Sequence, residues 1–287
     1  QAINLSISDD PHSYFSILNN SGGTLETSTQ YRTGSTAPAI DVLQSIGLER
    51  NARVFLDVLP TVGPNDSKAI IVVGDTMDDA LYSTFATLAD FAYFVLESEG
   101  LPRENIRFYA DDSSQLDGDV AGKPTLASLE ESITNWAQGS EKLLVYLIDH
   151  GQRDRFRMNA TEYLEADALD AWYDTLQDVP LADRTMITTV IDTCEAGSFV
   201  NNLQLSKSQK AEQDKGASGP QRITMTSSGQ GPVEGVALFD QAQYISFSLN
   251  FWFNIFNGRD YGQAFDDAKI SIEAINPLQV PQIDSDG

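Results

Sequence analysis

One cysteine and one of two histidines follow strand-like segments, and together they could carry out nucleophilic catalysis. Cys194 is the only cysteine in 287 residues and follows the apolar segment 186–192, and His150 follows the apolar segment 142–149. A free thiol is mostly protonated at neutral pH, so a nucleophilic cysteine needs a neighbouring base. Imidazole titrates close to neutrality, so it can take the thiol proton and later protonate a departing amine. The pair predicts acyl transfer through a thioester.

The positions of both residues favour this chemistry over a structural role. Each lies just beyond the carboxyl end of a predicted parallel strand, the edge at which α/β sheets place their ligands. If the two strands are neighbours, the thiol and the imidazole come close together. Gly151 and Cys194 could each direct a backbone N–H at a developing oxyanion. The alternative is a buried, inert cysteine and a structural histidine.

An alternating pattern of strands and helices from Lys68 onward predicts the elements that position these residues. Continuous apolar runs indicate strands buried on both faces, and repeated strand–helix units indicate a mainly parallel sheet covered by helices on both sides. Asp78 and Thr125 can cap two of the helices. The expected strands are 69–74, 105–110, 142–149, 186–192 and 221–227, and the expected helices follow Asp78 and Thr125 and span 166–177, 246–258 and 261–275.

The two ends of the chain differ from this α/β region. Residues 1–66 hold short strand-like pieces separated by Asn, Ser, Gly and Pro clusters. We predict a β-rich N-terminal extension, or the end of a preceding module, over 1–66 and an α/β domain over 67–287. The terminal segment 283–287 (IDSDG) we interpret as an acidic linker, because a calcium loop would need more of its ligand pattern.

Composition excludes several classes of function. The formal charge of −24 would repel nucleic acid and anionic membrane surfaces. No apolar run reaches the roughly 18–20 residues of a membrane helix, so we expect no membrane insertion. A single cysteine and two histidines do not form a thiolate-rich or multi-histidine metal site. The segment 118–125 lacks the spacing of a phosphate loop, and we expect neither a metal nor a cofactor.

Two motifs resemble those of the legumain-like cysteine peptidases, relatives of caspases, gingipains and clostripain. They are YLIDHG (146–151) and VIDTCEAGSF (190–199), and the likeness extends over about 68–275, including RITMTSSG at 222–229. The resemblance implies a caspase-like three-layer αβα sandwich, a polypeptide substrate and a bacterial source.

The resemblance also assigns roles to individual residues. It implies that Cys194 is the nucleophile and His150 the general acid and base, with the N–H groups of Gly151 and Cys194 forming the oxyanion hole. Asp192 matches the acid that lines the pocket for the residue before the scissile bond; a turn carboxylate is the alternative. Ser227 and Ser228 match the segment that binds the substrate backbone as an added strand, or they are ordinary polar loop residues.

One departure from the family pattern leaves specificity open. Legumains carry an asparagine and an arginine near the start of the first long helix, where this chain has Tyr82 and Thr84. Tyr82 therefore becomes a candidate substrate contact. Without that arginine, two alternatives stay open for the residue before the scissile bond. It could be Asn or Asp, as the family prefers, or Arg or Lys, since an acidic pocket around Asp192 suits a cation.

We expect an endopeptidase, and two other functions remain open. A transamidase uses the same dyad but lets an amine outcompete water. A non-catalytic extracellular binding module would keep only the fold. The polar loop 206–219 contains three lysines and lies where caspases are cleaved during activation, so self-cleavage there is a further expectation. The chain starts at Gln1 rather than methionine, and we expect a secreted or cell-surface protein cut from a larger precursor.

Overall fold

The computed structural model describes residues 67–74, 79–114, 116–179, 185–206, 209–210, 222–239 and 245–286, together with two short strands near the N-terminus. The chain divides into two units, residues 1–59 and 60–287. In the first unit, β1 (Ser16–Asn19) and β2 (Glu26–Ser28) form an antiparallel pair. The other strand-like pieces predicted within 1–66 lie outside the described residues, and the predicted boundary after residue 66 stays a prediction.

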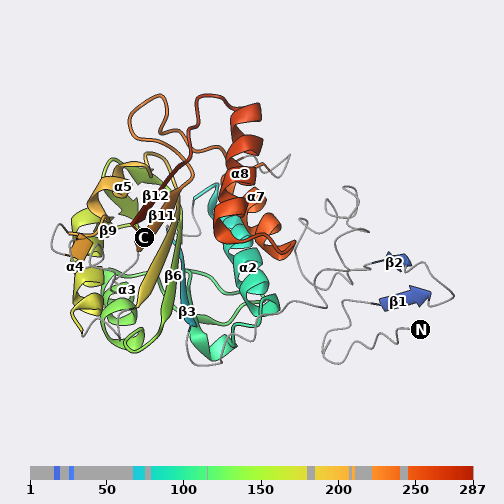
Figure 1. Ribbon diagram of the computed structural model, residues 1–287, viewed down its shortest axis with the longest axis horizontal. Coiled ribbons are helices and arrows are strands. Elements are labelled where there is room, and N and C mark those ends of the chain that lie inside the picture. The colour runs from blue at the N-terminus through green and yellow to red at the C-terminus, as the bar shows by residue number, and fades with distance from the viewer. Residues whose placement is uncertain are drawn as a thin grey trace. The chain divides into compact units, whose positions relative to one another are not determined.

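A seven-stranded sheet forms the centre of the second unit (Figure 1). Neighbouring strands are parallel except for β12, which runs antiparallel to β11 at one edge. In spatial order the strands are β12 (Gln282–Asp286), β11 (Arg222–Thr226), β10 (Met186–Asp192), β6 (Lys142–Ile148), β3 (Ser67–Val73), β4 (Ile106–Tyr109) and β5 (Val120–Gly122). The strand β12 corrects the prediction of an acidic linker at 283–287, because residues 282–286 complete the sheet instead.

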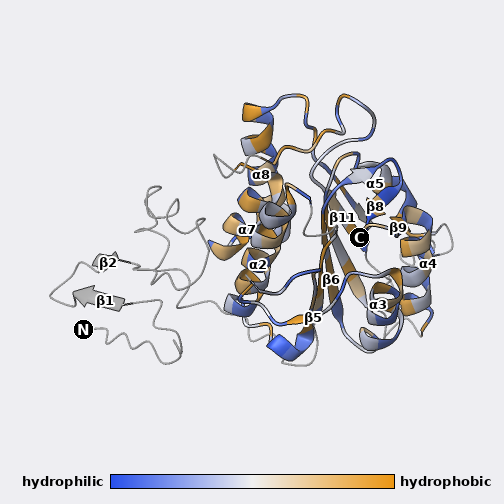
Figure 2. Ribbon diagram, turned by 180° about the vertical axis from the view of Figure 1, so that it is seen from behind, coloured by the Kyte–Doolittle hydropathy of each residue, from blue (hydrophilic) through white to orange (hydrophobic). Residues whose placement is uncertain are grey.

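Helices cover both faces of this sheet, as the strand–helix alternation predicts. One face carries α2 (Tyr82–Ser98), α7 (Phe247–Phe256) and α8 (Tyr261–Ile275). The other carries α3 (Leu126–Glu131) with its π-helical extension η3 (Ser132–Trp136), α4 (Ala166–Gln177) and the short α5 (Ser198–Asn202). The short 3₁₀ turn η2 (Arg103–Asn105) leads into β4. Figure 2 shows apolar colouring concentrated on the central strands and on the helix faces turned toward them. The predicted mainly parallel αβα sandwich is confirmed.

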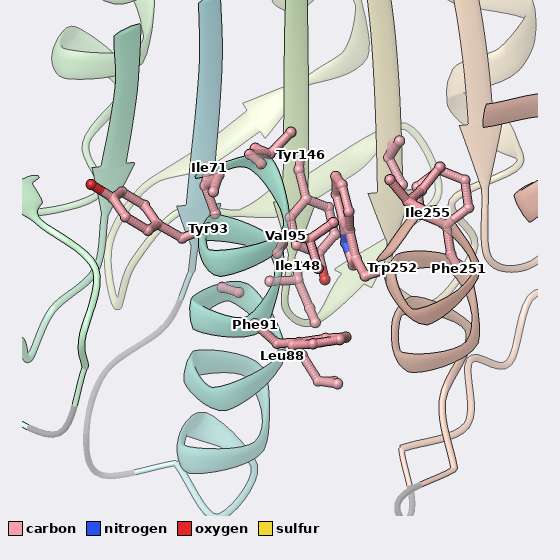
Figure 3. Packing of buried hydrophobic residues seen from close by; sticks show 14 of the residues in the cluster. Ile71, Leu88, Phe91, Tyr93, Val95, Tyr146, Ile148, Phe251, Trp252 and Ile255 are labelled. Atoms are coloured by element: carbon pink, nitrogen blue, oxygen red, sulfur yellow. The ribbon is translucent and has the colours of Figure 1, made fainter. Parts of the chain in front are cut away.

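Side chains of the central strands alternate between the two helical layers. In β3, Ile71 and Val73 pack in the cluster with α2 and α7, whereas Ile70 and Val72 pack in the cluster with α3 and α4. This alternation follows from the two-residue repeat of a strand. Figure 3 shows the first cluster, in which the Trp252 ring meets β6 and α2 side chains. Full burial of each such large side chain stabilises the fold by roughly 1.5–3 kcal/mol.

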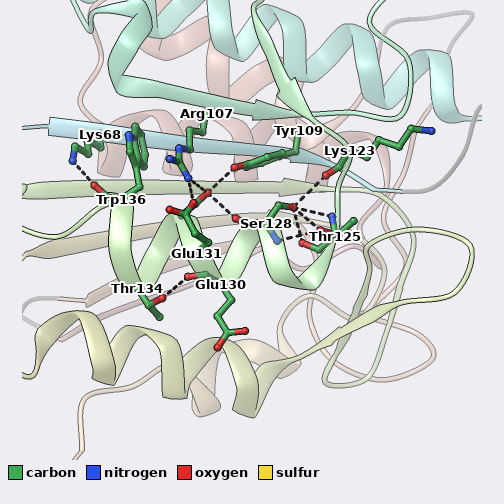
Figure 4. Close-up of polar contacts among 11 residues, drawn as sticks. Lys68, Arg107, Tyr109, Lys123, Thr125, Ser128, Glu130, Glu131, Thr134 and Trp136 are labelled. Carbon is green, nitrogen blue, oxygen red and sulfur yellow. Dashed lines mark hydrogen bonds and ion pairs between the residues drawn. The ribbon is translucent and has the colours of Figure 1, made fainter.

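The first turn of α3 shows how local sequence fixes a helix start. The Thr125 hydroxyl accepts a hydrogen bond from the Ser128 N–H, and the Ser128 hydroxyl accepts one from the Thr125 N–H, both at 3.1 Å (Figure 4). This reciprocal pair satisfies two amide groups that have no partner within the helix. The predicted cap at Thr125 is confirmed, whereas the predicted cap at Asp78 lies outside the described residues.

A second, three-stranded sheet follows β6 and was not predicted from the sequence. Its strands are β7 (Gly151–Gln152), β8 (Arg155–Arg157) and β9 (Tyr163–Glu165), all antiparallel. The strands β7 and β8 form a tight hairpin, and Asp154 in its turn has a positive φ of 59°. The hairpin begins one residue after His150, so it is joined directly to the predicted site.

Candidate active site

The strands that carry His150 and Cys194 are neighbours in the sheet. The strands β6 and β10 pair in parallel as far as Ile148 and Asp192, and the Asp149 N–H then donates to the Asp192 carbonyl at 3.3 Å. His150 therefore leaves the sheet at the same edge as Cys194. The sequence pattern predicts this arrangement.

Gly151 brings the two segments into direct contact. A Cβ atom added to Gly151 would lie 2.3 Å from the Thr193 hydroxyl oxygen and 2.8 Å from the Cys194 carbonyl oxygen. Any side chain at this position would force the histidine and cysteine segments apart. Glycine is therefore required here for close backbone approach.

An acidic residue fixes the histidine ring. The Asp79 Oδ2 atom lies 3.2 Å from His150 Nε2, and Asp79 Oδ1 accepts a hydrogen bond of 2.8 Å from the Leu81 N–H. The ring of Phe85 packs against the imidazole edge to face, with centroids 5.4 Å apart. Because Nε2 faces Asp79, Nδ1 is the ring nitrogen left for proton transfer.

Hydrogen bonds to the backbone hold the cysteine loop on both sides of the thiol. The half-buried Cys194 is followed by Glu195, which has a positive φ of 56° and donates its N–H to the Gly235 carbonyl at 2.6 Å. The Ser228 hydroxyl donates to the Thr193 carbonyl at 2.9 Å and accepts from the Ala196 N–H at 3.2 Å. The loop is thus tied to the segment after β11.

The two backbone N–H groups of the predicted oxyanion hole make no hydrogen bond within the described residues. The Arg157 N–H donates to the His150 carbonyl at 3.1 Å, which makes Gly151 and Phe156 a non-hydrogen-bonded pair of the hairpin. The Gly151 N–H therefore points away from β8. The Cys194 N–H has no acceptor within the described part of the chain. Both donors are available, as an oxyanion hole requires.

A cleft of about 460 Å³ opens beside the thiol. The hairpin after His150 forms one wall, the cysteine loop lies between the walls, and the segment after β11 forms the other wall. The lining residues are Gly151, Gln152, Arg153, Arg155, Cys194, Glu195, Gly231, Pro232, Gly235 and Val236. The cleft is large enough for a peptide segment, and it reaches the predicted nucleophile.

Asp192 is fully buried below the cysteine loop. Its Oδ2 accepts hydrogen bonds from the Ser248 N–H and from the Ser248 hydroxyl at the start of α7. Burial raises the pKa of Asp192, and hydrogen bonds from the Ser227 and Ser248 side chains oppose that rise. The carboxyl group therefore links β10 to α7, two residues before the predicted nucleophile.

The other predicted substrate contacts are turned toward the protein. Ser227 and Ser228 are fully buried, and the Ser227 carbonyl accepts a hydrogen bond from Gln279 at 2.8 Å. The Tyr82 hydroxyl accepts a hydrogen bond of 2.8 Å from the Asp112 N–H, and burial raises the pKa of Tyr82. None of the three is among the residues that line the cleft.

Two features of the site were missed in the sequence. Asp79 is one of several acidic residues before α2, where we expected only a helix cap. The sequence does not show which of these acidic side chains contacts the histidine. The arginines of the hairpin follow His150 directly, but the short strands β7 and β8 lack a long alternating pattern.

The described residues lack two further features, a metal site and a membrane-spanning helix. They contain no group of three or more His, Cys, Asp or Glu side chains placed to hold a metal ion. No helix within the same residues is long and apolar enough to cross a membrane.

Comparisons with known proteins agree with this geometry. Residues 134–211, which include His150 and Cys194, match the model of the Peptidase C13 family. The fold is similar to that of caspase-1 from Spodoptera frugiperda, with a TM-score of 0.51 and 14% sequence identity over 77% of this chain and 86% of that chain. The sequence matches no curated protein. The family match and the shared fold agree, and together they support a cysteine peptidase related to the legumain and caspase families.

Proposed function

We propose that this cysteine peptidase is an endopeptidase whose catalytic groups are Cys194 and His150, with Asp79 holding the histidine. The observation that carries the proposal is the close approach of Gly151 to the Thr193 side chain and the Cys194 carbonyl oxygen, at a cleft lined by both Gly151 and Cys194.

The reaction follows from the groups at this edge of the sheet. His150 takes the thiol proton as the Cys194 sulfur bonds to the scissile carbonyl carbon. The N–H groups of Gly151 and Cys194 stabilise the oxyanion that forms. His150 then gives its proton to the leaving nitrogen as the C–N bond breaks, which leaves an acyl-thioester. Water attacks the thioester with His150 accepting its proton, and the thiol is regenerated.

Two side-chain preferences before the scissile bond remain part of the proposal. Asp192 lies two residues before the nucleophile, and its carboxyl group accepts hydrogen bonds from Ser248. Asp192 is fully buried and is not among the residues that line the cleft, so it does not decide between Asn or Asp and Arg or Lys before the scissile bond. A peptide-library digest distinguishes these preferences.

The loop 206–219 is a candidate site of self-cleavage, and most of it lies outside the described residues. Its lysines suit a protease that prefers a cation before the scissile bond. Mass spectrometry of incubated wild-type protein should find a cut in this loop that Cys194→Ala lacks. Intact wild-type protein after long incubation would contradict self-cleavage.

The decisive experiment is a digest of a peptide library by the wild type and by Cys194→Ala. Wild-type cleavage at internal bonds, lost in Cys194→Ala and in His150→Ala, is the expected result. Cleavage that survives in Cys194→Ala would overturn the proposal. Adding a primary amine and analysing the products separates hydrolysis from transfer to the amine.

A further inference from the structure

The wall of the cleft next to the histidine is positively charged, although the chain carries a net charge of −24. Of the lining residues, Arg153 and Arg155 are cationic and Glu195 is the only acid. Both arginines lie on the β7–β8 hairpin. A local cationic wall in a strongly acidic chain suggests a role in recognition.

The guanidinium groups have hydrogen-bonding capacity left. The Arg153 side chain is 69% exposed, and its Nε lies 3.8 Å from the neighbouring Asp154 carboxylate. Arg155 uses Nε for the Glu165 carboxylate at 2.8 Å. Within the described residues, the two terminal nitrogens of each arginine make no ion pair, so they can bind a carboxylate in a two-pronged geometry.

The hairpin that carries the arginines is firmly held. The Asp154 N–H in its turn donates to the Ser198 hydroxyl at 2.7 Å, and the Asp154 carbonyl accepts from the Ala166 N–H at 2.9 Å. The strand β8 also pairs with β9. The arginines are thus presented on a supported element, so less ordering is needed when they bind a ligand.

The mechanism decides which part of a substrate meets this wall. The histidine must reach the leaving nitrogen, so the residues after the scissile bond lie on the histidine side of the cleft. The hairpin starts directly after His150, at Gly151. The wall with Arg153 and Arg155 therefore borders the leaving-group half of the substrate.

We propose that Arg153 and Arg155 select polypeptides with an acidic residue shortly after the scissile bond. This inference rests on the proposed endopeptidase function. Exposed ion pairs each contribute little, so two of them predict a preference of about two- to thirtyfold for Glu over Gln, weakened by salt.

The test compares matched peptides that differ only in Glu, Gln or Lys at the first three positions after the scissile bond. Wild-type kcat/KM should be higher for Glu, and the Glu-to-Gln ratio should fall toward one in Arg153→Gln/Arg155→Gln. Arg259→Gln, which changes an exposed arginine paired with Asp267 outside the cleft, should keep the wild-type ratio.

A binding measurement separates this inference from the proposed function. Fluorescence anisotropy with Cys194→Ala should show tighter binding of the Glu peptides than of the Gln peptides, and the two arginine substitutions in that background should remove the difference. Equal binding of the Glu and Gln peptides would overturn the inference. Tighter binding of the Lys peptides would overturn it too, because Glu195 would then be the residue that selects the substrate charge. Absence of cleavage with selective binding would instead count against the proposed function alone.

Discussion

The Asp79 carboxylate contacts the His150 ring and so can fix the orientation of the imidazole. The ring is half-exposed, so packing against Phe85 alone leaves it free to rotate. The Asp79 contact with Nε2 holds one orientation, and Leu81 in turn holds the carboxylate. Such a carboxylate also stabilises the imidazolium that forms when the thiol loses its proton.

We predict that Asp79→Ala lowers kcat/KM by about 10- to 100-fold, because a misplaced general base loses alignment with the thiol. Asp79→Asn should recover part of the activity, since it keeps an oxygen acceptor for Leu81. The loss in Asp79→Ala should fall on kcat more than on KM, because a misplaced ring impairs proton transfer rather than substrate binding.

The matched control is Asp119→Ala. The Asp119 side chain is 69% exposed, and its Oδ2 makes a long ion pair of 3.5 Å with Arg103. Its kcat and KM should equal those of the wild type. An Asp79→Ala variant that keeps the wild-type kcat would contradict the orienting role.

Two of the residues at the site could be predicted from the sequence for a simple reason. Cys194 and His150 are rare residue types, and each follows a long apolar strand that is easily recognised. Asp79 is one of 42 acidic residues, and its partner is 71 positions away in the chain, so only the folded geometry distinguishes it.

At the scale of elements, Asp192 joins the end of β10 to the start of α7. Its buried carboxyl group accepts two hydrogen bonds from Ser248, and the Ser248 hydroxyl also accepts one from Tyr146 at 2.7 Å. Burial raises the pKa of Asp192 because the charged form is poorly solvated. The carboxylate is therefore costly to the fold at neutral pH.

We predict that Asp192→Asn raises the free energy of unfolding by about 1–2 kcal/mol at neutral pH. The folded-state pKa lies above the unfolded value of about 4, so the contribution of Asp192 to stability is fully present below that value and is lost as the pH rises through the folded pKa. The advantage of Asn should therefore shrink as the pH falls toward about 4.

Urea denaturation across this pH range measures the effect. Asp266→Asn, at an exposed position of α8, should leave stability unchanged throughout. A difference between wild type and Asp192→Asn that grows as the pH falls would contradict the predicted direction.

A second link between elements joins β11 to α4. The Arg222 side chain is 2% exposed and donates from Nε to Gln177 at 2.9 Å and from its terminal nitrogens to Asp170 and Asp174 at 2.6 Å each. These buried ion pairs hold β11 and α4 together, because removing one partner would leave the other charges without a partner.

We predict that Arg222→Met lowers the free energy of unfolding by about 2–4 kcal/mol, since two like charges on α4 then face each other without a cation. Arg259→Met, which removes an exposed ion pair, should change it by less than about 1 kcal/mol. Chemical denaturation of both variants measures the difference, and equal values would contradict the role of Arg222.

The elements of the large sheet differ in how far the sequence predicts them. The strand β10 is a continuous apolar run, whereas β12 reads QIDSD and resembles a linker. An edge strand needs only one hydrogen-bonded neighbour and tolerates charged side chains. The order of the strands in the sheet depends on which distant segments pair. The spacing of apolar residues along the sequence carries no information about that pairing.

The whole molecule carries a large excess of acidic side chains. The 42 acidic and 18 basic residues leave a net charge of −24. Self-repulsion of this size opposes compaction, and dissolved ions screen it.

We predict that raising NaCl from about 0.02 M to about 0.5 M increases the Tm by about 2–5 °C. KCl at the same ionic strength should act alike, and an uncharged solute at the same osmolality should reproduce less of the change. A falling Tm would mean that attractive pairs such as Arg222 with Asp170 outweigh the repulsion.

The in-register pairing of β6 with β10 has a consequence for engineering. The separation of sulfur and imidazole is set by two central strands that pair from Met186 and Lys142 to Asp192 and Ile148. The walls of the cleft come from other segments, the hairpin after His150 and the stretch after β11. The sheet thus sets where the proposed catalytic residues lie, and replacing the cleft walls beyond Gly151 should change substrate preference without moving either residue.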